Sequence, residues 1–380
     1  MVLNKLRLEN FRRFKNVEVK FAKRLSVLVG INGAGKSSIL SALSTLLSWY
    51  VRRLVSPNGT GAGMTIPERD IQTDALSTTI ALAIEDDGKE VSWSVSKAAK
   101  GAPLFDVRSN LKELTEYVKD MRANKLESVP TIVAYTVNRS VLDIHLQIKK
   151  RHEFSVLSAY DDAFDRAANF RRFFEWFREW EDVENERIAD TLATGGVPYL
   201  ANNELAAVRR ALNRFLPEFS DWKIRRNPLR MEVKKDGKTL SVDQLSDGEK
   251  CMIALVGDLA RRLVVANPMR EDPLLGNGIV LVDEIELHLH PEWQKSILPR
   301  LLQTFPHVQF VVTTYSPLVL AQLNSLLYRK QGEIAVFGLR SGTVASLLDP
   351  DTGLIMNSEM DDAVAAVDEE FDALWAGGVR

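Results

Sequence analysis

The stretch Gly30-Ile31-Asn32-Gly33-Ala34-Gly35-Lys36-Ser37 matches the pattern G-x-x-x-x-G-K-[ST] at every place. It follows the apolar run 25–29 and precedes a helix-like run from Ser38. A strand, a glycine-rich turn and a helix in this order bring backbone N–H groups to phosphate oxygens at the positive end of the helix. In this motif the lysine reaches the β- and γ-phosphates and the last hydroxyl binds Mg²⁺. The sequence therefore predicts a nucleotide site made of Asn32, Gly33, Gly35, Lys36, Ser37 and Ser38, with Ser37 as a metal ligand.

The composition is that of a globular protein, with 45% hydrophobic and 26% charged residues among 380. The net charge of −2 neither indicates nor excludes a nucleic-acid binder, because a local basic face matters more than the sum. The single cysteine, Cys251, leaves no internal disulfide framework and is typical of a reducing compartment. The sequence contains neither a signal peptide pattern nor an apolar run of about 18 residues. We therefore expect a cytoplasmic protein.

Two stretches in the second half of the chain complete the site. Residues 245–250, L-S-D-G-E-K, open a long helical pattern, and the apolar run 278–282 ends in Asp283 and Glu284. An unbroken apolar run predicts a buried parallel strand, and the carboxyl ends of such strands are where these sheets bind ligands. In P-loop enzymes the aspartate at this place holds Mg²⁺, and the glutamate after it is placed to polarise the attacking water. We assign these roles to Asp283 and Glu284.

Together these stretches resemble the motifs of ABC-type ATPases. Residues 245–249 resemble the L-S-G-G-[EQ] signature with Asp247 in the third place, and 278–284 resemble the Walker B strand. Residues 286–291 resemble the E-x-x-L-H-P element of the RecF, SMC and OLD-like branch. The resemblance implies a homodimer or a higher even-numbered oligomer, in which two heads sandwich two ATP molecules. The signature residues that would face the nucleotide of the other head are Ser246, Gly248 and Glu249.

The last core strand of this branch usually ends in T-H-S-P, whereas residues 314–317 read T-Y-S-P. The resemblance implies a catalytic switch role for Tyr315. A tyrosine hydroxyl can hydrogen-bond a γ-phosphate or water, but it is neither ionised nor basic near pH 7. The substitution therefore predicts slow or conditional hydrolysis.

The middle of the chain resembles the family more loosely. Asn138 follows the strand-like run 130–135, where related ATPases place the loop that senses Mg²⁺ and substrate, and Gln72 is the rival for this role. The segment from Trp176 to Glu186 resembles a helix of stand-alone bacterial ATPases such as that of the Septu phage-defence system. The aromatic residues at helical spacing between 170 and 180 predict a helix core rather than a platform for stacking bases.

Spacing predicts the architecture. Lys36 and Leu245 are 209 residues apart, which is too few for an SMC arm and far more than a transporter ATPase needs. We expect an α/β P-loop NTPase of ABC-ATPase type with a mixed sheet, an antiparallel N-terminal β-subdomain and a helical insertion. The expected parts are residues 1–100, the insertion with a basic β-hairpin at 101–240, the second half of the head at 241–340 and an acidic tail at 341–380. The 63 residues after Pro317 are too few for an OLD-type nuclease domain, so we expect no nuclease centre in this chain.

Two functions stay open for this ATPase, which would use ATP and Mg²⁺. The first is a switch, driven by head dimerisation, that regulates a separately encoded effector such as a nuclease in anti-phage defence. The Septu-like middle and the acidic tail favour it, although the tail's amphipathic pattern also suits packing on its own domain. The second is a RecF/SMC-like ATPase that clamps DNA in repair or maintenance. The basic stretch 223–238 favours this function if it contacts the phosphate backbone; the alternative interpretation of the stretch is the solvated edge of a hairpin.

Overall fold

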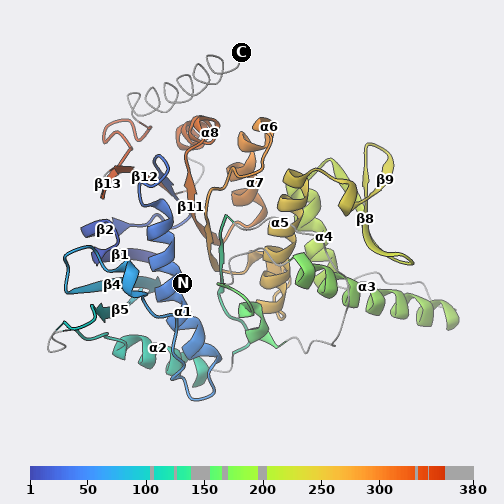
Figure 1. The fold of residues 1–380 in the computed structure, drawn as a ribbon. Helices are drawn as coiled ribbons and strands as arrows, with labels where there is room; N and C mark the ends of the chain where they lie inside the picture. Colours follow the sequence, from blue (N-terminus) through green and yellow to red (C-terminus); the bar gives the residue numbers. More distant parts are fainter. Residues whose placement is uncertain are drawn as a thin grey trace, which may run out of the picture. The chain divides into compact units, whose positions relative to one another are not determined.

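The computed structural model describes residues 1–102, 107–123, 126–137, 155–164, 170–195, 203–329, 333–340 and 342–355 (Figure 1). The chain divides into two compact units. Unit 1 comprises Met1–Ala123, Leu281–Pro299 and Gln309–Arg380, and unit 2 comprises Asn124–Val280 and Arg300–Val308. The division into four parts that the spacing suggested stays a prediction.

Unit 1 begins with an antiparallel sheet in the order β2-β1-β4-β5. The turn between β4 and β5 is made by Asp87 and Gly88, both with positive φ, as is usual for an Asp-Gly pair in a hairpin. Buried Gln309 ties this sheet to the core, because its side chain accepts a hydrogen bond from the N–H of Leu3 at 2.6 Å and donates to the Leu3 carbonyl at 3.0 Å. The strands are β1 (Val2–Phe11), β2 (Phe14–Lys20), β4 (Ser77–Asp86) and β5 (Lys89–Ala98).

The second sheet of unit 1 carries the phosphate loop. Its order is β13-β12-β3-β11, with the end of β10 next to β11. Strand β3 lies parallel to both β11 and β12, whereas β13 returns antiparallel to β12. The carboxyl ends of β3 and β11 therefore meet at one edge of the sheet. The strands are β3 (Leu25–Val29), β10 (Gly278–Val282), β11 (Val308–Thr314), β12 (Ile334–Arg340) and β13 (Thr343–Ser346).

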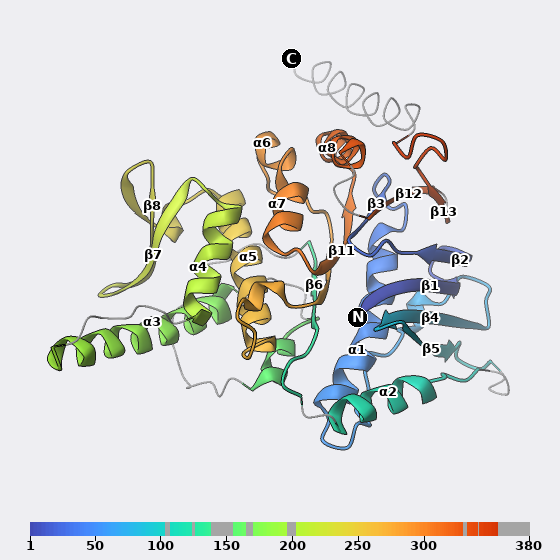
Figure 2. The ribbon, with the colours of Figure 1, turned by 180° about the vertical axis from the view of Figure 1, so that it is seen from behind.

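Helix α1 runs alongside the antiparallel sheet in both views (Figures 1 and 2). It buries its apolar face there, and Trp93 of β5 donates its indole N–H to the Leu46 carbonyl of α1 at 3.1 Å. The helices of unit 1 are α1 (Lys36–Val55), α2 (Lys112–Ala123), α6 (Pro291–Gln294) and α8 (Pro317–Tyr328), with the 3₁₀ helix η1 (Glu68–Asp70); α7 (Ile297–Thr304) spans the boundary.

Unit 2 is built around α5, which is buried along nearly its whole length between α3 and α4. The aromatic residues of α3 lie in this core, as predicted: Phe173, Phe174, Trp176 and Phe177 are all buried. A three-stranded sheet in the order β7-β8-β9 completes the unit. Its elements are β6 (Thr131–Tyr135), η2 (Val156–Tyr160), α3 (Phe170–Ala193), α4 (Asn203–Phe215), β7 (Phe219–Arg226), β8 (Leu229–Lys235), β9 (Lys238–Ser241), η3 (Val242–Gln244), α5 (Asp247–Ala266) and η4 (Pro273–Leu275).

The predicted fold class is confirmed: a mixed sheet, an antiparallel N-terminal sheet and a helical insertion are all present. Across the described ranges no helix has the length and apolarity that crossing a membrane would require. The predicted acidic tail helix falls largely on residues 356–380, outside the described part of the chain.

Candidate nucleotide-binding and hydrolysis site

The phosphate loop connects β3 to α1, and its glycines fit the turn for different reasons. Gly35, which caps α1, has a φ of 111°, and a Cβ there would lie 2.6 Å from the ring of Phe14. Gly33 has a φ of 78° with open space around it. The first turn of a helix has N–H groups without intrahelical acceptors, and side chains at these glycines would obstruct access to them. The loop therefore presents backbone donors at the N-terminus of a 20-residue helix.

Lys36 lies at the centre of the site and is only 5% exposed. Its ammonium donates to the carbonyls of Gly30 at 2.5 Å and Ile31 at 3.2 Å, and it lies 6.0 Å from the centroid of the Tyr315 ring. Burial lowers the pKa of Lys36, and the carboxylates of the three acidic residues after β10 act in the opposite direction: Glu284, Glu286 and Asp283. The lysine and these carboxylates therefore share one electrostatic site in unit 1.

Asp283 and Glu284 are held in place by Thr313 at the end of β11. The Thr313 hydroxyl donates to Asp283 Oδ1 at 2.6 Å and accepts from the Glu284 N–H at 2.7 Å. Glu284 has a φ of 47°, a left-handed conformation that costs a residue with a side chain about 1–3 kcal/mol. Strain of this kind persists only where neighbours enforce it, and it gathers at functional sites. Thr313 therefore holds the Asp283 carboxylate and the backbone of Glu284 in place.

Glu286 and Tyr315 form the next contact along the same edge. The Tyr315 N–H donates to Glu286 Oε1 at 2.9 Å, while the Tyr315 side chain stays 49% exposed. The neighbouring Ser316 caps α8 by accepting from the Val319 N–H, and its hydroxyl donates to Gln294 at 2.6 Å. The predicted switch residue thus has a fixed backbone and a side chain with access to solvent.

Arg12, which was not among the predicted site residues, lies in unit 1 beside α1. Its guanidinium donates to the hydroxyls of Ser38 and Ser41 and pairs with Asp70 at 3.0 Å. Gln72, the rival for the sensing role, donates its N–H to the carbonyl of residue 10 at the end of β1. Arg12 lies in the turn between β1 and β2, and no local pattern links it to its partner Asp70, which is 58 residues away.

The residues of this site fit a magnesium nucleotide. A loop that excludes side chains at Gly35 and carries a buried ammonium suits phosphate oxygens. Magnesium prefers oxygen ligands, and it usually binds one or two carboxylates together with phosphates and water. Asp283 supplies a buried carboxylate and Ser37 an exposed hydroxyl for this purpose.

The predicted signature residues lie in unit 2, at the start of α5. Ser246 caps the helix, and its hydroxyl and N–H both donate to the Glu249 carboxylate at 2.8 Å. Lys235 pairs with the same carboxylate at 2.5 Å. The Glu249 side chain is therefore engaged within unit 2, while Gly248 lies in the first turn, whose N–H groups lack intrahelical acceptors. Asn138 lies outside the described residues.

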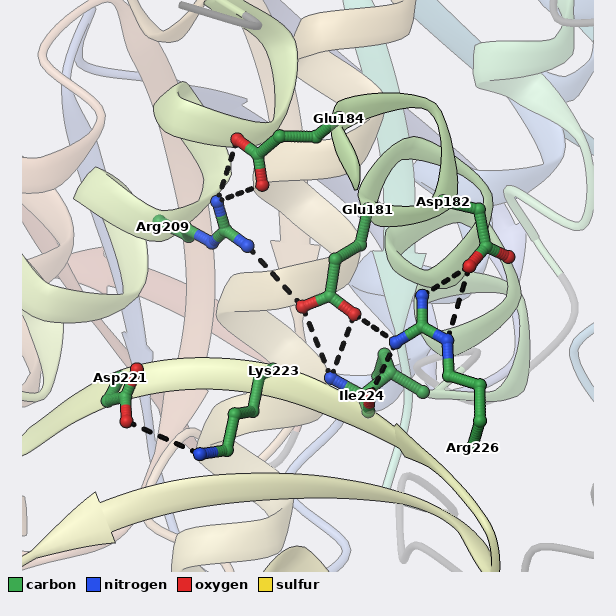
Figure 3. A network of polar contacts seen from close by, with 8 residues as sticks. All are labelled: Glu181, Asp182, Glu184, Arg209, Asp221, Lys223, Ile224 and Arg226. Carbon is green, nitrogen blue, oxygen red and sulfur yellow. Dashed lines mark hydrogen bonds and ion pairs between the residues drawn. The ribbon is translucent and has the colours of Figure 1, made fainter. Parts of the chain in front are cut away.

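Much of the basic stretch is paired inside unit 2 (Figure 3). Arg226 binds the buried carboxylate of Glu181, which also accepts from the Ile224 N–H at 3.0 Å and from Arg209 at 3.5 Å. Four of the seven basic residues have acidic partners, namely Lys223, Arg226, Arg230 and Lys235. The turn between β8 and β9 is made by Asp236 and Gly237, both with positive φ.

Comparisons with known proteins show the family of this chain. Residues 25–321 match the family described as "AAA domain, putative AbiEii toxin, Type IV TA system". The "Retron Ec83 probable ATPase" of Escherichia coli is 33% identical over 381 residues, which cover 84% of this chain and 69% of that protein. The "Septu protein PtuA" of Bacillus thuringiensis is 21% identical over 378 residues, covering 93% of this chain and 85% of that protein. Among solved structures, the SMC head bound to the C-winged helix domain of ScpA aligns with a TM-score of 0.49 and 18% identity, over 91% of this chain and 97% of that one.

The predicted resemblance to RecF/SMC/OLD-like ATPases, with Septu among them, is confirmed. The chain belongs to the AAA-domain ATPase family that its match over residues 25–321 defines, and it is homologous to the retron ATPase and to PtuA.

Proposed function

We propose that this protein binds ATP with Mg²⁺ and hydrolyses it. The observation that carries the proposal is the grouping of Lys36 with three carboxylates, in which the Thr313 hydroxyl binds the Asp283 carboxylate and the backbone N–H of Glu284. Lys36 and the N–H groups of the loop would bind the phosphates, while Ser37 and Asp283 would hold the metal. Bound Mg²⁺ supplies positive charge that neutralises the phosphate oxygens.

Glu284 orients and activates the attacking water in this proposal. A carboxylate that accepts a proton from water acts as a general base, which typically contributes about 10²- to 10⁴-fold to a rate. The N–H of Glu284 is bound to Thr313, so that the position of the carboxylate is restricted from its backbone. Tyr315 contributes a hydroxyl to the γ-phosphate side of the site.

ATP binding, we further propose, closes a dimer of two chains. In the closed form the N-terminus of α5, with Ser246 and Gly248, of one protomer faces the nucleotide that the loop of the other binds. A capped helix N-terminus suits this role, because its N–H groups and dipole favour an anion. A full reversal of such an equilibrium from 1:99 to 99:1 needs about 5.5 kcal/mol of differential binding.

The output of the switch would be a separately encoded effector, such as a nuclease, in bacterial anti-phage defence in the cytoplasm. The support is homology to a protein named a retron ATPase and to one named a Septu protein.

The test is the mass of the Glu284→Gln protein in solution, alone and with Mg-ATP at physiological salt. We expect retained ATP binding, turnover reduced by at least about 100-fold, and a shift to a larger even-numbered assembly with ATP. Glu292→Gln, which alters an exposed glutamate of unit 1, is the matched control and should behave as the wild type. An unchanged mass with ATP bound would rule out the closed dimer, and normal turnover would remove Glu284 from its role.

DNA binding is the second candidate, and three basic residues still favour it. Arg225, Lys234 and Lys238 are exposed and have no acidic partner within the described ranges. Arg225→Glu is therefore the informative charge reversal, since reversal at Arg226 would break its pair with Glu181. Salt-dependent binding of duplex DNA that Arg225→Glu weakens would support a clamp, and no binding at low salt would exclude it.

A further inference from the structure

The two carboxylate oxygens of Glu286 have different surroundings, although the residue as a whole is only 7% exposed. Oε1 accepts the Tyr315 N–H at 2.9 Å. Oε2 is buried and has no hydrogen-bond partner in the described part of the chain. A buried carboxylate oxygen without a donor is expensive, so each such atom in a folded protein calls for an explanation.

The surroundings of Glu286 point to a ligand donor as that explanation. Glu286 comes two residues after Glu284, on the turn where the Leu289 N–H donates to the Glu286 carbonyl at 2.9 Å. Its charge acts on Lys36 together with the charges of Asp283 and Glu284. Glu286 also binds the main chain of Tyr315, whose ring lies 6.0 Å from the Lys36 ammonium. Geometry as well as charge therefore links Glu286 to the phosphate loop.

We propose that Glu286 is a positioning residue that links the switch to the metal: Oε1 fixes the main chain of Tyr315, and Oε2 accepts from a water bound to Mg²⁺. This inference rests on the proposed function, because it takes a metal nucleotide as the ligand. Magnesium keeps several of its waters in such sites, and those waters are the donors that a carboxylate can accept from. Metal binding and the position of Tyr315 are thereby coupled through one side chain.

Two substitutions separate the oxygens. Glu286→Gln keeps an acceptor for the Tyr315 N–H but replaces the other oxygen by an amide that donates. Glu286→Ala removes both oxygens. Glu292→Gln again serves as the control on an exposed glutamate of the same unit.

The first readout is hydrogen exchange at the Tyr315 amide of the protein without nucleotide. We expect exchange about tenfold faster in Glu286→Ala, because its acceptor is lost, and unchanged exchange in Glu286→Gln. The second is the Mg²⁺ concentration at half-maximal binding of a fluorescent, non-hydrolysable ATP analogue. Loss of a partner in the outer coordination shell typically weakens metal binding 10–100-fold, so we expect a rise of about tenfold in Glu286→Gln.

An unchanged magnesium dependence in Glu286→Gln would overturn the metal link, and unchanged exchange in Glu286→Ala would overturn the link to Tyr315. Failure of the proposed function has a different signature: the wild type itself would then bind no analogue at any Mg²⁺ concentration. The control variant should match the wild type in both readouts.

Discussion

Two clusters of buried charged side chains, one in each unit, differ in how completely their polar atoms are paired. In unit 2, Asp258 of α5 is fully buried with Arg261 and Arg262. Asp258 Oδ1 accepts from Arg261 at 2.7 Å, and Oδ2 accepts from Arg262 at 2.8 Å and from the Tyr135 hydroxyl at 2.9 Å. Arg262 also donates to the Ala159 carbonyl at 2.6 Å. Both oxygens of the buried carboxylate therefore have donors within the fold.

The polar atoms around Lys36 in unit 1 have fewer of their possible hydrogen-bond partners. Lys36 donates to two backbone carbonyls although an ammonium has three donors, and one oxygen of Glu286 is buried without a partner. A cluster whose polar atoms all have partners specifies and stabilises a fold, whereas a cluster with capacity left over is ready for a ligand. The buried charges of unit 2 are thus paired within the fold, whereas those around Lys36 in unit 1 keep hydrogen-bonding capacity for the proposed ligand.

The largest expected effect tests the structural cluster. Asp258→Asn removes the negative charge from between two buried arginines, and breaking a buried ion pair by removing one partner costs about 3–5 kcal/mol. We expect the free energy of unfolding of unit 2 to fall by that amount. The measurement is urea denaturation monitored by tryptophan fluorescence, to which the buried Trp176 and Trp222 contribute. Asp221→Asn, which removes an exposed carboxylate paired with Lys223 at 3.6 Å, should change it by less than about 1 kcal/mol. Equal effects of the two substitutions would contradict a structural role for the buried Asp258 cluster.

The pH dependence sharpens the same test. The two arginines lower the pKa of Asp258 from 3.8 to about 2, against the opposing effect of burial. A lowered pKa in the folded state means that this contribution to stability is present above about pH 4 and is lost as the pH falls towards 2. The difference in stability between the wild type and Asp258→Asn should therefore shrink over that interval.

Removal of the buried charge of Lys36, by contrast, should leave the free energy of unfolding nearly unchanged. Burial lowers the pKa of Lys36, so the fold tolerates this cation rather than depending on it. We expect Lys36→Ala to change the free energy of unfolding by less than about 1 kcal/mol while ATP affinity falls by about 2–5 kcal/mol, since truncating one partner of a buried charge pair costs that much. Isothermal titration with ATP and thermal unfolding measure the two effects, and Lys295→Ala, on an exposed lysine of unit 1, is the control. Unaltered ATP affinity would contradict the assignment of the loop.

The local motifs were predictable from the sequence because their function depends on neighbours in the chain. The phosphate loop needs glycine at Gly35, whose positive φ and contact with Phe14 leave no room for a side chain. The capping of α5 by Ser246 and the Asp-Gly turns follow from similar local rules. The buried run before Asp283 likewise predicted a strand with ligand-binding residues at its end.

The contacts that complete the site were not predictable in this way. Thr313 and Asp283 are 30 residues apart, and Glu286 and Tyr315 are 29 apart, so only the pairing of β10 and β11 brings them together. No periodicity in either strand distinguishes these residues from ordinary strand ends. The pairing of Arg226 with Glu181 was hidden for the same reason, and the sequence therefore overstated the free charge of the basic hairpin.

The smallest effect concerns Tyr315. Its backbone N–H donates to Glu286, and its exposed ring lies 6.0 Å from the ammonium of Lys36 in the phosphate loop. Tyr315→His replaces a phenol hydroxyl, which can donate a hydrogen bond, by an imidazole, which can accept or donate a proton near pH 7. Because the proposed function assigns the base to Glu284, we expect only about a three- to tenfold rise in ATP turnover, with ATP affinity nearly unchanged. Tyr315→Phe keeps the ring beside Lys36 and loses the hydroxyl, so it separates the effect of the ring from the effect of the hydroxyl. If turnover stays at the wild-type rate in Tyr315→His, tyrosine at this position does not slow hydrolysis, and the restraint would then have to lie in the closing of the dimer.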